Sequence, residues 1–167
     1  MRSLLLPLLA AGLAAGCAPH LRQPHLPPPA LYSASPAPSL ALPAALRTAS
    51  STGKRVLLVF GADWCSDSRA MHRRLTTDPT LAPLVTESFH LVLVDVGERH
   101  GPLWDAPVVQ TYGQPFQDRG IPALVVLDPD GTQLTHRDNN PLVDSDHRRP
   151  RRLRAFLQRW APPRPGS

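Results

Sequence analysis

The chain has 167 residues, of which 42 % are hydrophobic, and its formal net charge at pH 7 is +5. This length gives room for one domain and an appendage, and the apolar content is enough for one compact core, which excludes a wholly disordered chain. The 21 prolines are more than an ordinary globular domain contains, so part of the chain is expected to lie outside the folded domain.

Residues 1–16 have the pattern of a secretory leader. One positive charge at Arg2 is followed by an apolar run that is too short to span a membrane, and the run ends in Leu-Ala-Ala-Gly-Cys. This ending resembles the lipobox of bacterial lipoproteins, which implies cleavage before Cys17 and lipidation of that cysteine. The next residue is Ala18 and not aspartate, which by the same resemblance favours the outer membrane, with the protein facing the periplasm. A plain signal peptide followed by a chance cysteine is the alternative.

A proline-rich segment follows the leader and predicts an extended tether. Eight prolines fall between residues 18 and 46, and such a segment cannot bury enough apolar surface to fold. We therefore predict a disordered tether over 17–46, a folded domain over 47–162 and a disordered tail over 163–167. The last part of the tether, around residues 42–50, is a candidate for a short helix that opens the domain.

The folded part reads as an α/β domain with a mixed sheet, in the order β-α-β-α-β-β-α. Continuous apolar runs of strand length predict strands that are covered on both faces, and apolar residues at helical spacing predict helices. Asp130-Gly131 between two extended runs predicts a hairpin. In chain order the expected elements are a strand at 55–61, a helix at 65–75, a second helix from Asp78-Pro79 that Pro83 interrupts, a strand at 89–97, one helical turn near 105–113, a strand-turn-strand unit at 121–138 and a helix at 148–160.

Cys65 is the candidate for chemistry, because it lies where the first predicted strand gives way to a helix. If Cys17 is lipidated, Cys65 is the only free thiol of the mature protein, so it pairs with another molecule, reacts or is buried. The start of a helix offers unsatisfied N–H groups and a positive dipole end, both of which favour the reactive thiolate. Ser68, one turn further on, is placed to offer a donor to the same sulfur.

The segment 56–65, with the sequence VLLVFGADWC, and the segment 119–131, with the sequence RGIPALVVLDPDG, resemble the thioredoxin superfamily. The resemblance covers residues 45–162. It implies that Trp64 and Cys65 form the active-site pair. It also implies that Pro122 follows a cis peptide bond against the active site, and that the backbone of Ile121 positions a substrate peptide. The resemblance implies no cofactor.

Two departures from the family pattern leave the function open. The family's Cys-x-x-Cys site is Cys65-Ser66-Asp67-Ser68 here, and the buried acid that the family often carries six residues before the nucleophile is Val59. Without a second thiol, a mixed disulfide has to be resolved by another molecule. One hypothesis is thiol–disulfide exchange through Cys65 alone, with exported proteins or small thiols as partners. The alternative is a redox-inactive module that binds or scaffolds an envelope protein.

The remaining polar clusters predict no further site. The seven histidines are scattered without ligand spacing, so no metal site is expected. The basic run 148–159 lacks interleaved aromatic residues, so we expect a solvated helix face and no nucleic-acid partner, with weak attraction to a membrane surface as the alternative. Packing is the expected role of three aromatic residues in the poorly patterned segment 98–119: Trp104, Tyr112 and Phe116.

Overall fold

A computed structural model describes residues 29–98, 106–113, 119–136, 140, 142 and 149–163. Its helices and strands are α1 (Pro38–Thr52), β1 (Arg55–Gly61), α2 (Ser66–Thr77), α3 (Ala82–Ser88), β2 (Phe89–Asp95), α4 (Ala106–Tyr112), β3 (Ala123–Leu127) and α6 (Pro150–Trp160). The predicted leader and tether up to residue 28, including Cys17, lie outside the described residues, as do Trp104, Phe116 and residues 164–167. None of the helices in the described ranges is both long and apolar enough to cross a membrane.

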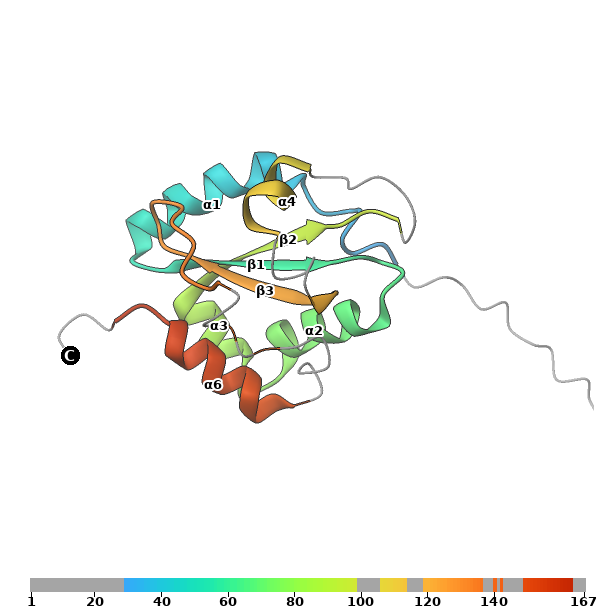
Figure 1. Cartoon of the computed structure of the whole chain (residues 1–167). Helices are drawn as coiled ribbons and strands as arrows, with labels where there is room; N and C mark the ends of the chain where they lie inside the picture. Colours follow the sequence, from blue (N-terminus) through green and yellow to red (C-terminus); the bar gives the residue numbers. More distant parts are fainter. Residues whose placement is uncertain are drawn as a thin grey trace, which may run out of the picture.

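The described strands form a mixed sheet with the order β2-β1-β3 (Figure 1). β1 runs parallel to β2, with Gly61 opposite Asp95, and antiparallel to β3, with Phe60 opposite Ala123. α1 and α4 cover one face of the sheet, and α2, α3 and α6 cover the other (Figure 1). This arrangement confirms the predicted α/β fold with a central mixed sheet.

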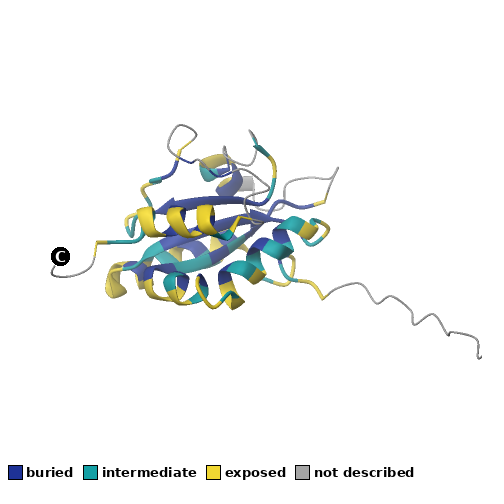
Figure 2. Ribbon diagram, turned by 90° about the horizontal axis from the view of Figure 1, so that it is seen from below, coloured by how far each residue is buried: buried dark blue, intermediate teal, exposed yellow. Residues whose placement is uncertain are grey.

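Side chains of β1 alternate between two hydrophobic cores, one on each face of the sheet. Leu57 and Val59 join the core under α2, α3 and α6, and Val56 and Leu58 join the core under α1 and α4. Figure 2 shows the strands as a buried layer between helices whose outer faces are exposed. Burying one side chain of this kind stabilises the fold by about 1.5–3 kcal/mol. The spacing in α6 predicts one apolar face of four residues. Three of them are buried in the core, Leu153, Phe156 and Leu157, and Trp160 packs against that core partly buried.

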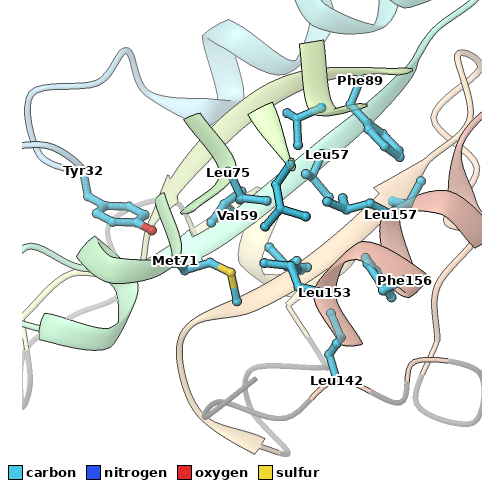
Figure 3. Close-up of a cluster of buried hydrophobic side chains, with 14 residues drawn as sticks. Tyr32, Leu57, Val59, Met71, Leu75, Phe89, Leu142, Leu153, Phe156 and Leu157 are labelled. Atoms are coloured by element: carbon cyan, nitrogen blue, oxygen red, sulfur yellow. The ribbon is translucent and has the colours of Figure 1, made fainter. Parts of the chain in front are cut away.

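The folded domain begins earlier than the sequence indicates. The predicted boundary between residues 46 and 47 lies inside α1. Tyr32, which the tether was expected to include, is only 2 % exposed and lies in the core under α2, α3 and α6 (Figure 3). Proline content is misleading here, because Pro38 lies in the first turn of α1, where the N–H that proline lacks has no partner within the helix. Leu42 of the same helix is buried in the core under α1 and α4.

The helix expected at Asp78-Pro79 begins later, at Ala82. The carboxylate of Asp78 accepts hydrogen bonds from the N–H and the hydroxyl of Thr80, which holds a turn and not a helix at this point. Pro83 was expected to interrupt the helix, but it lies in the first turn of α3, where proline is well accommodated.

The second arm of the predicted hairpin is reduced to a single bridge between Leu127 and Gln133 in the described part of the chain. The turn itself is present, with Gly131 at a φ of +88°. Beyond it, the N–H of Val126 donates 2.9 Å to the side-chain hydroxyl of Thr135. A side-chain acceptor here takes the place of a backbone acceptor, so the ladder does not continue as a strand.

Candidate functional site

Cys65 lies in the turn between β1 and α2 and is the N-cap residue of α2. Its N–H donates to the carbonyl of Ala62 at 3.1 Å, and its own carbonyl accepts the first helical hydrogen bond, from Arg69. The thiol is free and partly exposed. Its sulfur makes no capping hydrogen bond with the first turn of the helix. The position predicted for the cysteine is therefore present, but the sulfur points elsewhere.

The sulfur of Cys65 lies 3.8 Å from the carbonyl oxygen of Ile121, within reach of a weak S–H···O hydrogen bond. The peptide bond between Ile121 and Pro122 is cis, as the resemblance implies, and Pro122 is buried. β3 begins directly after this proline and pairs antiparallel with β1, which brings residues 56 positions apart in the chain together. A carbonyl oxygen can only accept a hydrogen, so the thiol is the donor in this contact.

Trp64 presents its ring to solvent beside Cys65, with 42 % of the residue exposed. Its indole N–H donates to the carbonyl of Gly97 at 2.8 Å, and the N–H of Gly97 donates to the carboxylate of Asp95 at 3.0 Å. Burial raises the pKa of Asp95, the hydrogen bond from Gly97 opposes this rise, and the nearby charge of Asp63 adds to it. The turn after β2 therefore fixes the orientation of the tryptophan.

Ser68 is fully buried, and its hydroxyl oxygen has no hydrogen-bond partner. The expected hydrogen bond from this hydroxyl to the sulfur of Cys65 is therefore not formed. Because Ser68 lies on the inner face of α2 with Met71 and Leu75, its side chain points toward the core. A buried polar group without a partner costs about 1–3 kcal/mol.

Sequence reasoning misses a segment that packs against the site, which we term the strap, residues 29–35. The carboxylate of Asp63 accepts hydrogen bonds from the backbone N–H groups of Leu31 at 2.8 Å, Tyr32 at 3.0 Å and Ser33 at 3.1 Å. It also accepts the hydroxyl hydrogen of Ser33 at 2.6 Å. Asp63 directly precedes the Trp-Cys pair, so the strap is attached to the active-site turn itself.

Arg69, which follows Cys65 in the chain, also binds the strap. Its guanidinium donates to Asp63 at 3.1 Å and to the carbonyl of Pro29 at 2.9 Å. Partial burial alone would raise the pKa of Asp63, but the hydrogen bonds from Ser33, Tyr32 and Leu31 lower it to about 2. The carboxylate is therefore ionised at neutral pH and holds the strap as an anion.

The side chain of Tyr32 fills the space between β1 and α2 (Figure 3). Its hydroxyl donates to the carbonyl of Ser68 at 3.3 Å, and its ring lies so close to Gly61 that a side-chain carbon there would overlap it. Burial raises the pKa of the phenol, and the nearby charges of Cys65 and Asp63 raise it further, so the phenol stays protonated. The acidic Asp63 next to the Trp-Cys pair is the one sequence feature that could have indicated a hydrogen-bonded segment here. Tyr32 could not have been found, because it lies in a proline-rich run without periodicity.

The described part of the chain contains no group of three His, Cys, Asp or Glu side chains that could hold a metal ion. The arrangement around Cys65 consists of a partly exposed thiol, an exposed indole and a backbone carbonyl at a cis-proline. These groups can support nucleophilic sulfur chemistry on a peptide or on a small disulfide.

Comparisons with known proteins agree with this geometry. Residues 37–129 match the family model described as Thioredoxin-like. The crystal structure of a disulphide isomerase from Xylella fastidiosa Temecula1 is similar, with 31 % identity over 72 % of this chain and 88 % of that chain, and a TM-score of 0.59. No curated protein matches the chain in sequence.

Two more distant structures also align with the chain. A DsbH oxidoreductase has 22 % identity over 68 % of this chain and 79 % of that chain, with a TM-score of 0.45. A thioredoxin from Thermus thermophilus has 18 % identity over 66 % of this chain and 82 % of that chain, with a TM-score of 0.43. The family match, which spans more than half of the chain, and the identity to the Xylella fastidiosa protein show that this chain belongs to the thioredoxin-like family of the thioredoxin superfamily.

Proposed function

We propose that the chain carries out thiol–disulfide exchange through Cys65 alone, in a Cys-x-x-Ser site. The observation that carries this proposal is the placement of a partly exposed thiol at the start of α2, 3.8 Å from the carbonyl that precedes cis Pro122. The similarity to a disulphide isomerase over most of the domain supports exchange chemistry in general.

The proposed reaction conserves the number of disulfides. The thiol of Cys65 loses its proton, and the sulfur attacks one sulfur of a partner disulfide. The partner's S–S bond breaks, a new S–S bond joins Cys65 to the partner, and the second partner sulfur leaves as a thiolate that takes up a proton. Since Ser68 supplies no second thiol, a thiol of the same partner or a small external thiol must then release Cys65. The natural partners in this scheme are exported proteins or small thiols.

We also propose that this chemistry takes place in the cell envelope. The leader at 1–16 and the lipobox-like sequence before Cys17 support export and a lipid anchor that faces the periplasm, on the outer membrane because Ala18 follows the cysteine. In that setting the exchange partners are exported proteins, because cytosolic proteins rarely carry disulfides.

The alternative proposal is a redox-inactive module that binds or scaffolds an envelope protein. The observation that favours it is the direction of the sulfur, which makes no capping hydrogen bond to the helix start and instead contacts the carbonyl of Ile121. In this case Trp64, which is well exposed, is the anchor for a partner surface.

The two proposals differ in the reactivity of Cys65. We would mix the Cys17→Ser variant with glutathione disulfide and follow the mixed disulfide by intact mass, with Cys65→Ser as the blank. A matched control carries Cys65→Ser together with Ser50→Cys, which moves the single thiol to an exposed position in the last turn of α1. Exchange at Cys65 that is about tenfold faster than at the control thiol is expected for an enzyme. An equal or slower rate would overturn the exchange proposal and leave the binding module.

A further inference from the structure

The strap fixes the place where the N-terminal part of the chain enters the domain. Arg69 holds the carbonyl of Pro29, the first described residue, and Asp63 holds the backbone of the next residues. Asp63 lies in the turn before Cys65, and Arg69 lies in the first turn of α2 after it. The chain therefore enters the fold at the rim of the candidate active site.

Several independent contacts hold the strap in this place. The carboxylate of Asp63 takes three backbone N–H groups and one hydroxyl, and hydrogen bonds to an ionised acceptor are about twice as strong as neutral ones. The phenol of Tyr32 is bound to the carbonyl of Ser68, and Gly61 leaves room for the ring. A segment with a buried aromatic side chain and a charged anchor is part of the domain and not a loose linker.

The other end of the described chain lies at the opposite end of the sheet. Arg55, at the start of β1, donates to the carbonyls of Trp160 and Ala161 at the end of α6. β1 has seven residues and is about 20 Å long, and Cys65 follows its other end. Figure 1 shows the end of α6 on the side of the sheet away from the β1–α2 turn. A domain attached to a membrane through its N-terminus and one attached through its C-terminus would therefore turn opposite ends of the sheet toward that membrane.

We propose that the strap turns the active-site rim toward the membrane that carries the lipid anchor, so that the substrates are disulfides lying close to that membrane surface. This proposal rests on the proposed exchange at Cys65 and on lipidation of Cys17. Twelve peptide bonds separate Cys17 from Pro29, so the entry point lies at most about 40 Å from the anchor in any conformation. A tether that ended at residue 46 would reach about 100 Å on the same basis.

A short attachment at the rim raises the concentration of Cys65 at the membrane surface. Joining two reactants through a short flexible chain gives effective concentrations in the millimolar range, and the value falls with roughly the −3/2 power of the linker length. Disulfides in membrane-proximal segments gain this advantage, whereas disulfides in freely diffusing proteins do not. The strap thus selects substrates by location and needs no recognition of their sequence.

The test compares two disulfide probes on the lipidated full-length chain in phosphatidylcholine vesicles. One probe is a pyridyl disulfide attached to a phosphatidylethanolamine headgroup, and the other is a soluble pyridyl disulfide, with the released thiopyridone measured by absorbance. The control domain carries Cys17→Ser and a lipid attached through an equally long linker after Pro163. We expect the ratio of headgroup rate to soluble rate to be about fivefold or more higher for the N-terminal anchor. Equal ratios would overturn the proposal.

The soluble probe separates this proposal from the exchange proposal. If Cys65 reacts with the soluble probe no faster than the Ser50→Cys control thiol, exchange fails, and the orientation is then measured without chemistry at Cys65. For that purpose a fluorophore on Ser66→Cys in a Cys65→Ser background reports energy transfer to an acceptor on the headgroups. Higher transfer for the N-terminal anchor than for the C-terminal one supports the orientation, and equal transfer overturns it. A full-length chain that does not stay with the vesicles overturns the anchor and the orientation together.

The strap itself is tested by the triple variant Tyr32→Ala, Asp63→Asn and Arg69→Gln, which removes the buried ring together with the charged anchor. Release of the strap moves the entry point to the start of α1 at Pro38 and lengthens the linker from twelve to twenty-one peptide bonds. The ratio of headgroup rate to soluble rate should then fall about twofold or more. Because each rate is divided by the soluble rate of the same variant, a change in the reactivity of Cys65 cancels. An unchanged ratio would show that the strap has no part in orienting the site.

Discussion

The hydroxyl of Tyr32 donates a hydrogen bond of 3.3 Å to the carbonyl oxygen of Ser68, which lies 36 positions further along the chain. This contact joins a residue of the proline-rich segment to the first turn of the helix that begins after Cys65. Together with the anchor at Asp63 it attaches the strap to both sides of Cys65 in the chain. The stability of the domain and the shape of the site therefore depend on residues that precede α1.

Truncation of Tyr32 should destabilise the whole domain. Tyr32→Ala removes a side chain that is 2 % exposed and leaves a cavity, so the free energy of unfolding should fall by about 3 kcal/mol. Tyr32→Phe loses only the hydrogen bond to Ser68 and should cost about 1 kcal/mol. Urea unfolding followed by circular dichroism measures both. Leu40→Ala is the matched control, because Leu40 is 76 % exposed and its loss should change the stability by less than about 0.5 kcal/mol. Equal values for Tyr32→Ala and Leu40→Ala would mean that the strap is not part of the folded domain.

Gly61 and Tyr32 should show strong coupling in a double-mutant cycle. A methyl group on Gly61 would overlap the ring of Tyr32, so Gly61→Ala should cost about 1–3 kcal/mol in the natural sequence. In a Tyr32→Ala background the ring is absent, and the same substitution should cost much less. Coupling is the difference between the two costs, measured by urea unfolding. A cost that is the same in both backgrounds would place the strain at Gly61 in the backbone and not in the contact with Tyr32.

The sheet could be predicted because each strand contains a continuous apolar run, and the helices because their apolar residues recur at helical spacing. β1 contributes to both cores, so nearly every one of its residues has to be apolar. An apolar run of this kind can be recognised in the sequence without knowing which strands it pairs with. The Trp-Cys and Ile-Pro pairs were placed by the resemblance to the thioredoxin superfamily, and the structure brings the sulfur of Cys65 to 3.8 Å from the carbonyl of Ile121.

The strap could not be predicted, because its contacts are made between residues about thirty positions apart. The bond from Tyr32 to Asp63 spans 31 positions, and nothing in the proline-rich run marks Tyr32 as a core residue. The role of Ser68 was also wrong in detail. A helix start suggests that its hydroxyl faces the sulfur, but the helical phase that buries Met71 also turns Ser68 into the core.

Acid should weaken the attachment of the strap at Asp63. The pKa of Asp63 in the folded chain is about 2, below the ordinary value near 3.9 for an unfolded chain. A depressed pKa contributes stability that is fully present above the unfolded value and is lost as the pH falls from about 4 toward 2. After allowance for solvent screening, the contribution at pH 7 is about 1–2 kcal/mol.

Asp63→Asn isolates this contribution from the other carboxylates. The difference in unfolding free energy between the natural sequence and the variant should be largest near pH 7 and should shrink below pH 4 as Asp63 becomes protonated. Urea unfolding at a series of pH values measures the difference directly. A difference that stays constant down to pH 2.5 would show that the charge of Asp63 does not hold the strap.

Ser68→Ala should stabilise the domain slightly and leave the reactivity of Cys65 unchanged. The substitution removes a buried hydroxyl that has no partner, so the free energy of unfolding should rise by up to about 1 kcal/mol. Because this hydroxyl makes no hydrogen bond to the sulfur, the rate of mixed-disulfide formation with glutathione disulfide should stay the same. A clear fall in that rate would restore the supporting role that the sequence suggests for Ser68.

Ser68→Cys tests whether the absence of a second thiol is what keeps Cys65 from releasing a partner after it has formed a mixed disulfide. Cysteine at this position lies one helical turn after Cys65 and replaces a buried side chain of similar size. When Cys65 forms a mixed disulfide, the new thiol can attack it, release the partner and leave an internal disulfide. We therefore expect the mixed disulfide to accumulate at least about tenfold less than in the natural sequence, with oxidised protein in its place. Intact mass spectrometry with glutathione disulfide separates the two products, and Ser68→Ala serves as the matched control. Persistence of the mixed disulfide in Ser68→Cys would mean that the inward direction of this side chain keeps it from Cys65.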